Sequence, residues 1–230
     1  MRQVFLSNPW IHHEEPEELR QIYYKYGTLR KIKKDAFLKN GGESAQISLL
    51  LNGLGTFSFE GLNEKPIIFS LVLPNRVLGD MDGFSGQLVN VNARLTRDSE
   101  ILSVERSTFM SIIEKNPSLH TMLTKSLIAK QESNLEAMIA CHTLGVEARL
   151  KVFLKCLLTS TQKNMISGWI PVTLYLSHEE FASIINASRV TISKLFSSWE
   201  EQNLLTKKGR MICVHTNLFS DVYDWLEPKR

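Results

Sequence analysis

Hydrophobic and polar positions alternate along the chain, and two changes in their period divide it into three regions. From about Glu15 to Phe109, a short amphipathic helix (15–27) is followed by runs such as LRKIKKDAFL and ARLTRDSEILSV, in which branched and aromatic residues alternate with polar ones. Turn residues separate these runs about every ten positions, without helical crossovers between them. Short, closely spaced strands of this kind are typical of an antiparallel barrel or jelly roll.

Three clusters of turn-forming residues are expected to connect these strands. Lys39-Asn40-Gly41-Gly42 and Glu60-Gly61-Leu62-Asn63 are rich in residues that accept turn conformations. Asn52-Gly53 interrupts AQISLLLNGLGTFSF and is expected to join its two halves as a strand pair. The apolar run IIFSLVL then forms a further strand.

From Ser107 the hydrophobic period lengthens to that of a helix. After a break at Asn116-Pro117, residues 118–142 continue without another helix-breaking residue. We expect their apolar stripe to pair with the same helix of a second chain, because a rod of about 37 Å outreaches a small barrel. The alternative is a helix packed on the barrel of its own domain. The stripe consists of Leu119, Met122, Leu123, Leu127, Leu135, Met138 and Ile139.

The region from about Gly145 onward is predicted to be richer in helix, with helices at 146–162, 177–186 and 188–203. Leu204–Lys207 and Met211–Val214 flank the turn residues Lys208-Gly209-Arg210. We therefore expect a short strand pair with two cations at its tip.

The second and third of these helices carry the signals of a helix-turn-helix motif. Ser177 and Glu180 have the spacing of a capping box, which marks the start of the first helix. Asn186 lies where the turn needs a left-handed residue, and Ser188 can cap the second helix. The expected inward-facing positions are Phe181, Ala182, Ile184, Ile185, Ile192, Leu195, Phe196 and Trp199.

The exposed start of the second helix suits the major groove of DNA, because cations, hydroxyls and the positive end of the helix dipole coincide there. Arg189 is the expected specificity residue, since an arginine can bond the O6 and N7 of guanine at once. Lys194 can reach a base or a phosphate, and Val190 offers an apolar contact. The candidate DNA contacts are Ser177, His178, Ser188, Arg189, Val190, Thr191, Ser193, Lys194, Lys207, Lys208 and Arg210.

A winged helix that binds protein instead of DNA is the alternative interpretation, and local charge argues against it. Between Arg189 and Arg210 there are five cations and only Glu200 and Glu201 as acids, so this segment carries as much net charge as the whole chain, +3. Basic clusters of this kind favour a polyanionic partner.

Composition adds few constraints. The 230 residues are 43% hydrophobic and 22% charged, which is typical of a folded globular protein rather than of a disordered or membrane-embedded chain, and the sequence pI is about 8.7. Without a signal peptide or a long apolar span, we expect a cytoplasmic protein. Cys141, Cys156 and Cys213 lack metal-site spacing and are expected to be buried free thiols.

The remaining candidate sites concern metal, haem, thiol and catalytic chemistry. His12-His13-Glu14-Glu15 is expected to be a solvated tail rather than a metal site, and His12, His13 and His120 show no arrangement of haem ligands. Cys141 beside His142 is a candidate thiol switch. The sequence contains none of the common hydrolase, metalloprotease or phosphate-loop motifs, so we expect neither an enzyme nor a cofactor.

Taken in order, barrel, long helix and winged helix-turn-helix resemble the Crp/Fnr family of bacterial transcription regulators. FASIINASRVTISKLFSSWEEQNLLTKKGRMICV is similar to the DNA-binding domain of that family, GGESAQISLLLNGLGTFSF to its Gly-Glu turn and the strands that follow, and LGDMDGFSG to the start of its phosphate-binding cassette. The resemblance implies an α+β fold. Its parts would be an N-terminal antiparallel β jelly roll like a cyclic-nucleotide-binding domain (1–116), a long dimerisation helix (117–143) and a C-terminal winged helix-turn-helix (144–230).

The resemblance also implies partners. A homodimer through residues 117–143 would bind a two-fold related operator in double-stranded DNA, with one recognition helix in each of two major grooves. RNA polymerase is a further candidate partner, and no membrane partner is expected.

The effector pocket implied by the family departs from its pattern here. In place of the Glu and the Arg-Ser pair that hold a cyclic nucleotide, the matching positions are Asp80, Val89 and Asn90, and Asn134 and Leu135 replace hydroxyl residues of the long helix. We expect that cyclic AMP does not bind, because a buried phosphate would lack a cationic partner. The candidate pocket residues are Gly79, Asp80, Met81, Val89, Asn90 and Asn134, with Arg94 as a substitute cation.

Two regulatory mechanisms stay open. Either another effector in the barrel shifts the arrangement of the long helices, or the barrel is a scaffold and the dimer is always competent to bind DNA.

Overall fold

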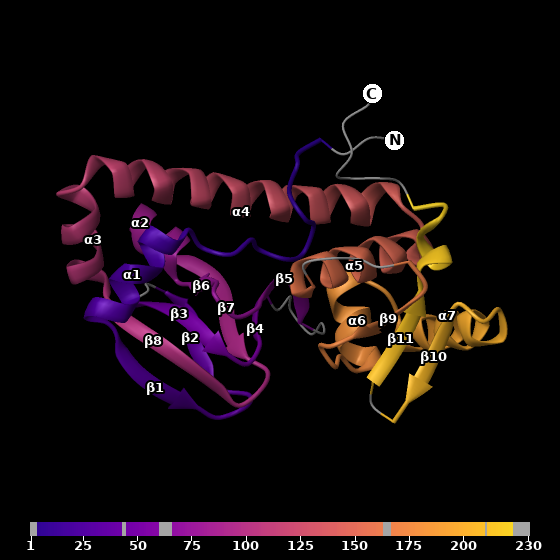
Figure 1. The fold of residues 1–230 in the computed structure, drawn as a ribbon. Coiled ribbons are helices and arrows are strands. Elements are labelled where there is room, and N and C mark those ends of the chain that lie inside the picture. The colour runs from indigo at the N-terminus through magenta and orange to yellow at the C-terminus, as the bar shows by residue number, and fades with distance from the viewer. Residues whose placement is uncertain (1–3, 43–44, 60–65, 163–166, 210, 223–230) are drawn as a thin grey trace. The chain divides into compact units, whose positions relative to one another are not determined.

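The fold is described from a computed structural model, which covers residues 4–42, 45–59, 66–162, 167–209 and 211–222 (Figure 1). The chain forms two compact units. The first, here called the β-roll unit, contains residues 12–134; the second, called the DNA-binding unit, contains residues 1–11 together with residues 135–230. The predicted boundaries at residues 116 and 143 therefore differ from this division. The division between the two units lies within the long helix, and the first eleven residues belong to the C-terminal unit.

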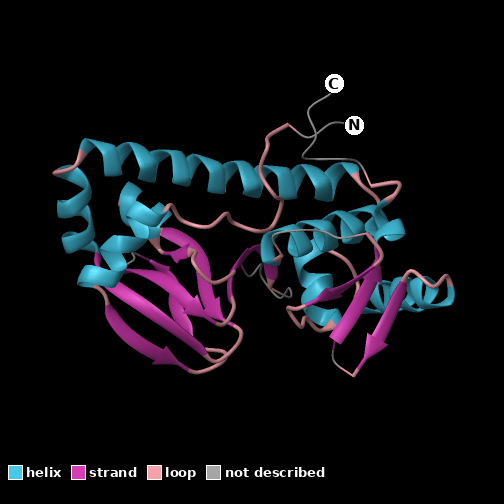
Figure 2. Cartoon of the chain, viewed as in Figure 1, coloured by secondary structure: helices cyan, strands magenta, loops and turns pink. Residues whose placement is uncertain are grey.

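The β-roll unit contains two four-stranded antiparallel sheets (Figure 2). The first has the order β1 (Thr28–Ile32), β8 (Ser99–Glu105), β3 (Gln46–Asn52) and β6 (Val77–Leu78). The second has the order β2 (Phe37–Gly42), β7 (Val89–Leu95), β4 (Gly55–Phe59) and β5 (Ile67–Val72). The predicted antiparallel β roll is confirmed.

The prediction that Asn52-Gly53 joins a strand pair is wrong. β3 pairs with β8 and β6, whereas β4 pairs with β5 and β7, so this corner passes the chain from one sheet to the other. Gly53 has a φ of 109°, and a Cβ atom at this position would lie 2.0 Å from Ser99 Oγ. Close approach of the Ser99 segment therefore requires glycine at the corner.

The other two expected turns have different outcomes. Residues 39–42 are not a separate turn but the end of β2, where Gly41 and Gly42 take positive φ. The Glu60-Gly61-Leu62-Asn63 turn lies outside the described residues.

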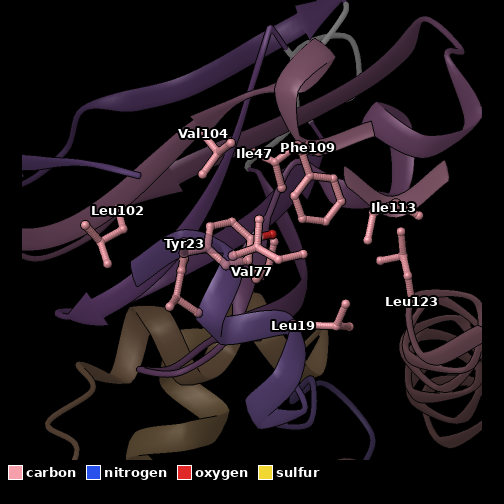
Figure 3. Close-up of a cluster of buried hydrophobic side chains, with 11 residues drawn as sticks. Leu19, Tyr23, Ile47, Val77, Leu102, Val104, Phe109, Ile113 and Leu123 are labelled. Atoms are coloured by element: carbon pink, nitrogen blue, oxygen red, sulfur yellow. The ribbon is translucent and has the colours of Figure 1, made fainter. Parts of the chain in front are cut away.

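Helices cover one end of the β roll. Figure 1 shows α1 (Glu17–Tyr26), α2 (Asp80–Ser85) and α3 (Arg106–Glu114) gathered there with the first half of α4 (Pro117–Thr143). Their apolar side chains meet the inward side chains of the first sheet, and Figure 3 shows Leu123 pointing from α4 toward Ile113. The buried cluster is Leu19, Ile22, Tyr23, Ile47, Leu49, Val77, Leu102, Val104, Phe109, Ile113 and Leu123.

The apolar stripe predicted along α4 does not lie on a single face. Leu119, Met122 and Leu127 pack with Leu123 against the core of the β-roll unit, as the alternative interpretation had it, whereas Leu135 and Met138 are exposed. At 3.6 residues per turn, the sixteen residues from Leu119 to Leu135 rotate the stripe by about 160°. Leu135 therefore faces the side of the helix opposite to Leu119.

The solvated tail predicted for residues 12–15 is wrong for His12 and Glu15, whereas Glu14 is exposed and His13 is half-buried. His12 and Glu15 are fully buried, and the backbone amide of Glu15 donates to the carbonyl of Asn75 at 2.9 Å. Polar partners within the same unit accompany this burial, since His12 bonds Asn134 and the Glu15 carboxylate pairs with Lys130.

The DNA-binding unit combines helices with one small sheet. Its elements are α5 (Val146–Thr161), β9 (Trp169–Val172), α6 (His178–Ile185), α7 (Arg189–Glu201), β10 (Leu205–Lys208), β11 (Met211–His215) and a final 3-10 helix, Thr216–Phe219. β11 lies between β10 and β9 in an antiparallel sheet. The sequence pattern did not predict β9, which is only four residues long and is interrupted by Pro171. The winged helix-turn-helix is confirmed.

No helix of the described segments has both the length and the apolar character needed to cross a membrane.

Candidate nucleic-acid interface

Two capped helices build the helix-turn-helix. Ser177 Oγ accepts from the backbone amide of Glu180, and the Glu180 carboxylate accepts from the amide of Ser177 at 2.8 Å, so the predicted capping box is present. Asn186 ends α6 with φ 53°, in the left-handed conformation expected for the turn. Ser188 Oγ accepts from the amide of Thr191 at 3.0 Å and starts α7. These local bonds set where each helix begins and ends.

Aromatic packing fixes the angle between the two helices. Phe196 of α7 contacts Phe181 of α6 edge-on, with ring centroids 5.3 Å apart, and stacks on Trp199, with ring centroids 5.9 Å apart. Trp199 also donates its indole N–H to Glu147 of α5 at 3.2 Å. Leu195, expected on the inward face, is only half-buried. The inner face of α7 is therefore occupied, and its opposite edge stays at the surface.

The exposed edge of α7 carries the residues expected to read DNA. Ser188, Arg189, Val190 and Lys194 are exposed, and the first turn of the helix contains no acidic residue. Neither Arg189 nor Lys194 makes a hydrogen bond or an ion pair with the described residues. Arg189 lies at the positive end of the helix dipole and Lys194 one turn further along, and both are available to an anionic ligand.

Besides the capping residues Ser177 and Ser188 and the Thr191 hydroxyl, which lies 2.8 Å from Ser188 Oγ, three more predicted contacts have internal partners. His178 Nδ1 lies 2.8 Å from Ser193 Oγ, so these two side chains join the starts of α6 and α7. Burial, and then the charges of Lys207 and Arg189, lower the pKa of His178. Lys207 Nζ donates to Glu200 Oε2 at 2.8 Å. His178, Ser193 and Lys207 therefore make contacts within the protein as well as lying on the candidate DNA-binding surface.

A hollow of about 470 Å³ lies between the start of α7 and the wing formed by β10 and β11. Arg189, Lys207 and Gly209 border it on one side, and the segment from Leu174 to Glu179 borders it on the other. Tyr175 lines this hollow and is 47% exposed. Tyr175 was not among the predicted contacts, and the alternation in Leu174-Tyr175-Leu176 was its only signal in the sequence.

Lys208 lies at the tip of the wing, exposed and without a hydrogen-bond or ion-pair partner among the described residues. Arg210, the other cation expected there, lies outside them.

A second site is a cavity of about 410 Å³ in the β-roll unit. Five of the six predicted pocket residues line it: Gly79, Asp80, Met81, Val89 and Asn134. Asn90 does not, because alternation along β7 turns Val89 and Val91 inward and leaves Asn90 exposed. The cavity is also lined by Phe57, Phe69 and Gln131. The sequence pattern did not predict these three residues.

The buried ammonium of Lys130 is the main unexpected feature of this site. Its Nζ forms ion pairs with Glu15 and, at 2.5 Å, with Asp80, and all three side chains are almost fully buried. Burial alone would lower the pKa of Lys130, but the two carboxylates more than offset this and raise it. Lys130 therefore stays charged, and Asp80 is already engaged by a cation of the protein itself.

The other charges near the cavity are paired as well. Lys39 forms a buried ion pair with Asp82, which lines the cavity. Arg94, the suggested substitute cation, bonds Asp35 at 2.9 Å and does not line the cavity. The described walls thus offer no cation without a carboxylate partner.

The cysteines differ in burial, and none of them forms a disulfide. All three cysteines are free, but only Cys156 is buried, where burial raises the pKa of its thiol to about 12, while Cys141 and Cys213 are half-buried. Cys141 Sγ lies 3.9 Å from the carbonyl of Ile185. No group of three or more metal-ligating side chains occurs within the described segments.

Comparisons with known proteins agree with this architecture. A family model described as the Crp-like helix-turn-helix domain matches residues 151–216. The cAMP-activated global transcriptional regulator CRP of Salmonella typhimurium is 20% identical over 183 residues, which cover 79% of this chain and 86% of that protein. The structure of FixK2 from Bradyrhizobium japonicum has a TM-score of 0.74 at 17% identity and covers 86% of this chain and 98% of that one.

A further similar structure is that of the c-di-GMP responsive global regulator CLP of Xanthomonas campestris, with a TM-score of 0.69 at 13% identity over 87% of this chain and 99% of that one. The names of these proteins mention two different effectors, cAMP and c-di-GMP. Likeness to them therefore assigns no effector to this chain.

Proposed function

We propose that the chain is a DNA-binding transcription regulator of the Crp/Fnr type, in which α7 reads the major groove of an operator through Arg189 and Lys194. The observation that carries the proposal is the exposed edge of α7, on which Arg189 in the first turn and Lys194 in the second turn lack internal partners. Lys208 at the wing tip would contact the phosphate backbone.

The two kinds of contact predict different mutant behaviour. Arg189→Ala should cost about 1–3 kcal/mol on the operator and relax base preference at one position of each half-site, because a bidentate contact to guanine is lost. Lys208→Ala should weaken binding to every sequence alike and reduce the dependence of log K on log salt by about one unit.

Selection from a random duplex library, followed by salt titrations on the enriched site and on a scrambled duplex, measures both effects. Lys115→Ala, an exposed cation of the β-roll unit, is the control and should change neither. Equal losses on both duplexes for Arg189→Ala would contradict its role in specificity, and the absence of any enriched site would contradict sequence-specific binding.

We infer that the regulator is a homodimer in which two α4 helices pair. Between Thr121 and His142 the exposed positions of α4 are Thr121, Lys125, Ile128, Gln131, Leu135, Met138 and His142. Successive positions are three or four residues apart, as along the seam of a coiled coil. The side chains of Ile128, Leu135 and Met138 are 54%, 42% and 51% exposed, so a second copy would bury the apolar part of this seam.

We also propose that cyclic AMP does not activate this regulator. A cyclic phosphate in the cavity could gain one of these cations by taking Lys130 from Asp80 or Glu15, or Lys39 from Asp82, and either exchange would leave a carboxylate unpaired. Breaking a buried ion pair in this way costs about 3–5 kcal/mol, enough to weaken binding by a factor of about 100 or more. The aromatic pair Phe57 and Phe69 and the amides of Gln131 and Asn134 would suit an uncharged ring compound better.

A further inference from the structure

The chain crosses between its two compact units twice. The helix α4 crosses between Asn134 and Leu135, and the N-terminal segment crosses between Ile11 and His12. Residues 4–15, here called the N-terminal strap, therefore belong half to the DNA-binding unit and half to the β-roll unit. A conformational change that moves one unit relative to the other has to be accommodated at both crossings.

The first half of the strap is anchored in the DNA-binding unit. The backbone amides of Val4 and Phe5 both donate to Glu136 Oε1, at 2.7 and 2.5 Å. Trp10 is 1% exposed, and its ring meets Phe153 of α5 edge-on at 5.9 Å. The backbone of Trp10 is left-handed with φ 62°, a conformation that a bulky residue adopts only where its surroundings impose it.

The second half is anchored in the β-roll unit. The amides of His12 and Glu15 donate to the carbonyls of Leu71 and Asn75, at 3.4 and 2.9 Å. Glu15 is further held by its buried ion pair with Lys130.

A hydrogen bond joins the two crossings. His12 Nε2 lies 3.3 Å from Asn134 Oδ1, and these are the β-roll residues nearest to the two crossing points. Asn134 lines the cavity, and the His12 ring packs against Phe57, which also lines it, at 5.8 Å. A molecule entering the cavity would thus touch both residues that hold the His12 ring.

We propose that the N-terminal strap is a coupling element, which transmits changes at the cavity wall to the DNA-binding unit through the backbone from His12 to Trp10, in parallel with α4. His12, Asn134 and Trp10 are its positioning residues. This inference goes beyond the proposed DNA recognition, because it concerns how the units are coupled and needs no particular operator.

Amide hydrogen exchange of the full chain tests the proposal without DNA. Asn134→Ala removes the bond to His12 and should raise exchange in α5 around Phe153 by about five- to tenfold, the effect of losing one buried hydrogen bond. Ser103→Ala, which removes the buried bond between Ser48 and Ser103 in the same unit, is the matched control and should leave α5 unchanged.

An insertion separates the strap from α4 as the route of coupling. Four flexible residues inserted between Ile11 and His12 leave both anchors and α4 intact but slacken the strap. In this background, Asn134→Ala should raise α5 exchange less than about twofold. An equal rise with and without the insertion would show that α4 alone carries the coupling and would overturn the proposal, as would no rise in either background.

A reciprocal variant tests the same coupling without an insertion in the strap. Phe153→Leu loosens the Trp10 anchor and should raise exchange of the His12 and Glu15 amides, whereas Phe196→Leu, in the same unit but away from Trp10, should not. Equal effects of both substitutions, or no effect of Phe153→Leu, would contradict the strap. Failure of DNA binding leaves these readouts unaffected, so the two proposals fail separately.

Discussion

His12 is a buried histidine that the fold holds in its neutral form. Burial is the main cause, and the nearby Lys130 charge adds to it, so that the pKa of His12 falls to about 3. The Nε2 atom then has to carry the proton that bonds Asn134. His12 can make this hydrogen bond without placing a charge in the interior only while its ring stays neutral.

This depressed pKa predicts a dependence of stability on pH. Between pH 6.5 and pH 3 the unfolded chain protonates His12 and the folded chain does not, so the free energy of unfolding should fall by up to about 1.4 kcal/mol per pH unit as the pH decreases. Urea unfolding measured from about pH 7 to about pH 5 should show a smaller slope for His12→Gln than for the native protein. His120→Gln, which alters an exposed histidine, is the control, and an unchanged slope for His12→Gln would contradict the assignment.

Single residues also show what a one-dimensional pattern can and cannot predict. Ser177, Asn186 and Ser188 were identified correctly because capping depends on neighbours within three residues. Lys130 was missed, since nothing in a run of helical polar residues indicates that Asp80 and Glu15, 50 and 115 positions away, will enclose it.

Among the elements, α4 has two roles at different positions along its length. Its first half covers the core of the β-roll unit through Leu119, Leu123 and Leu127, and the side opposite Leu119 carries Leu135. The length of the helix was predictable from the absence of breakers. Which side faces the β roll was not, because the residues that cover it belong to other elements.

Charge placed on the exposed seam of α4 should dissociate the proposed dimer. Leu135→Glu would remove two leucines from the interface and oppose two carboxylates, so the dimer Kd should rise at least about 100-fold. Sedimentation velocity over a range of concentrations measures this. Leu88→Glu, at a position that is 74% exposed elsewhere in the chain, is the control. A native protein that sediments as a monomer, or a Leu135→Glu protein that stays dimeric, would refute pairing through α4.

For the whole molecule, the cavity and the DNA-binding edge are the two sites that regulation has to connect. The charge pairs around the cavity, Lys130 with Asp80 and Lys39 with Asp82, lead to a prediction about ligands. Calorimetric titration with cyclic AMP should show no saturable heat at micromolar concentrations, because the phosphate would compete with buried carboxylates.

Asp80→Asn releases Lys130 from one of its partners and should increase affinity for cyclic AMP over that of the native protein. Asn90→Ala, which alters an exposed residue outside the cavity, is the matched control. Micromolar binding by the native chain would overturn the prediction.

Local sequence was enough to identify the strands of the β roll, the long helix, the helix-turn-helix and the exposed edge of α7, since period, caps and turns act over a few neighbouring residues. Long-range contacts settled the rest: the corner at Gly53, the burial of His12 and Glu15, the ammonium of Lys130 beside Asp80, and the attachment of Trp10 to the DNA-binding unit. These features join residues far apart in the chain, and the free energy that holds them comes from burial and charge pairing, which exist only once the chain has folded.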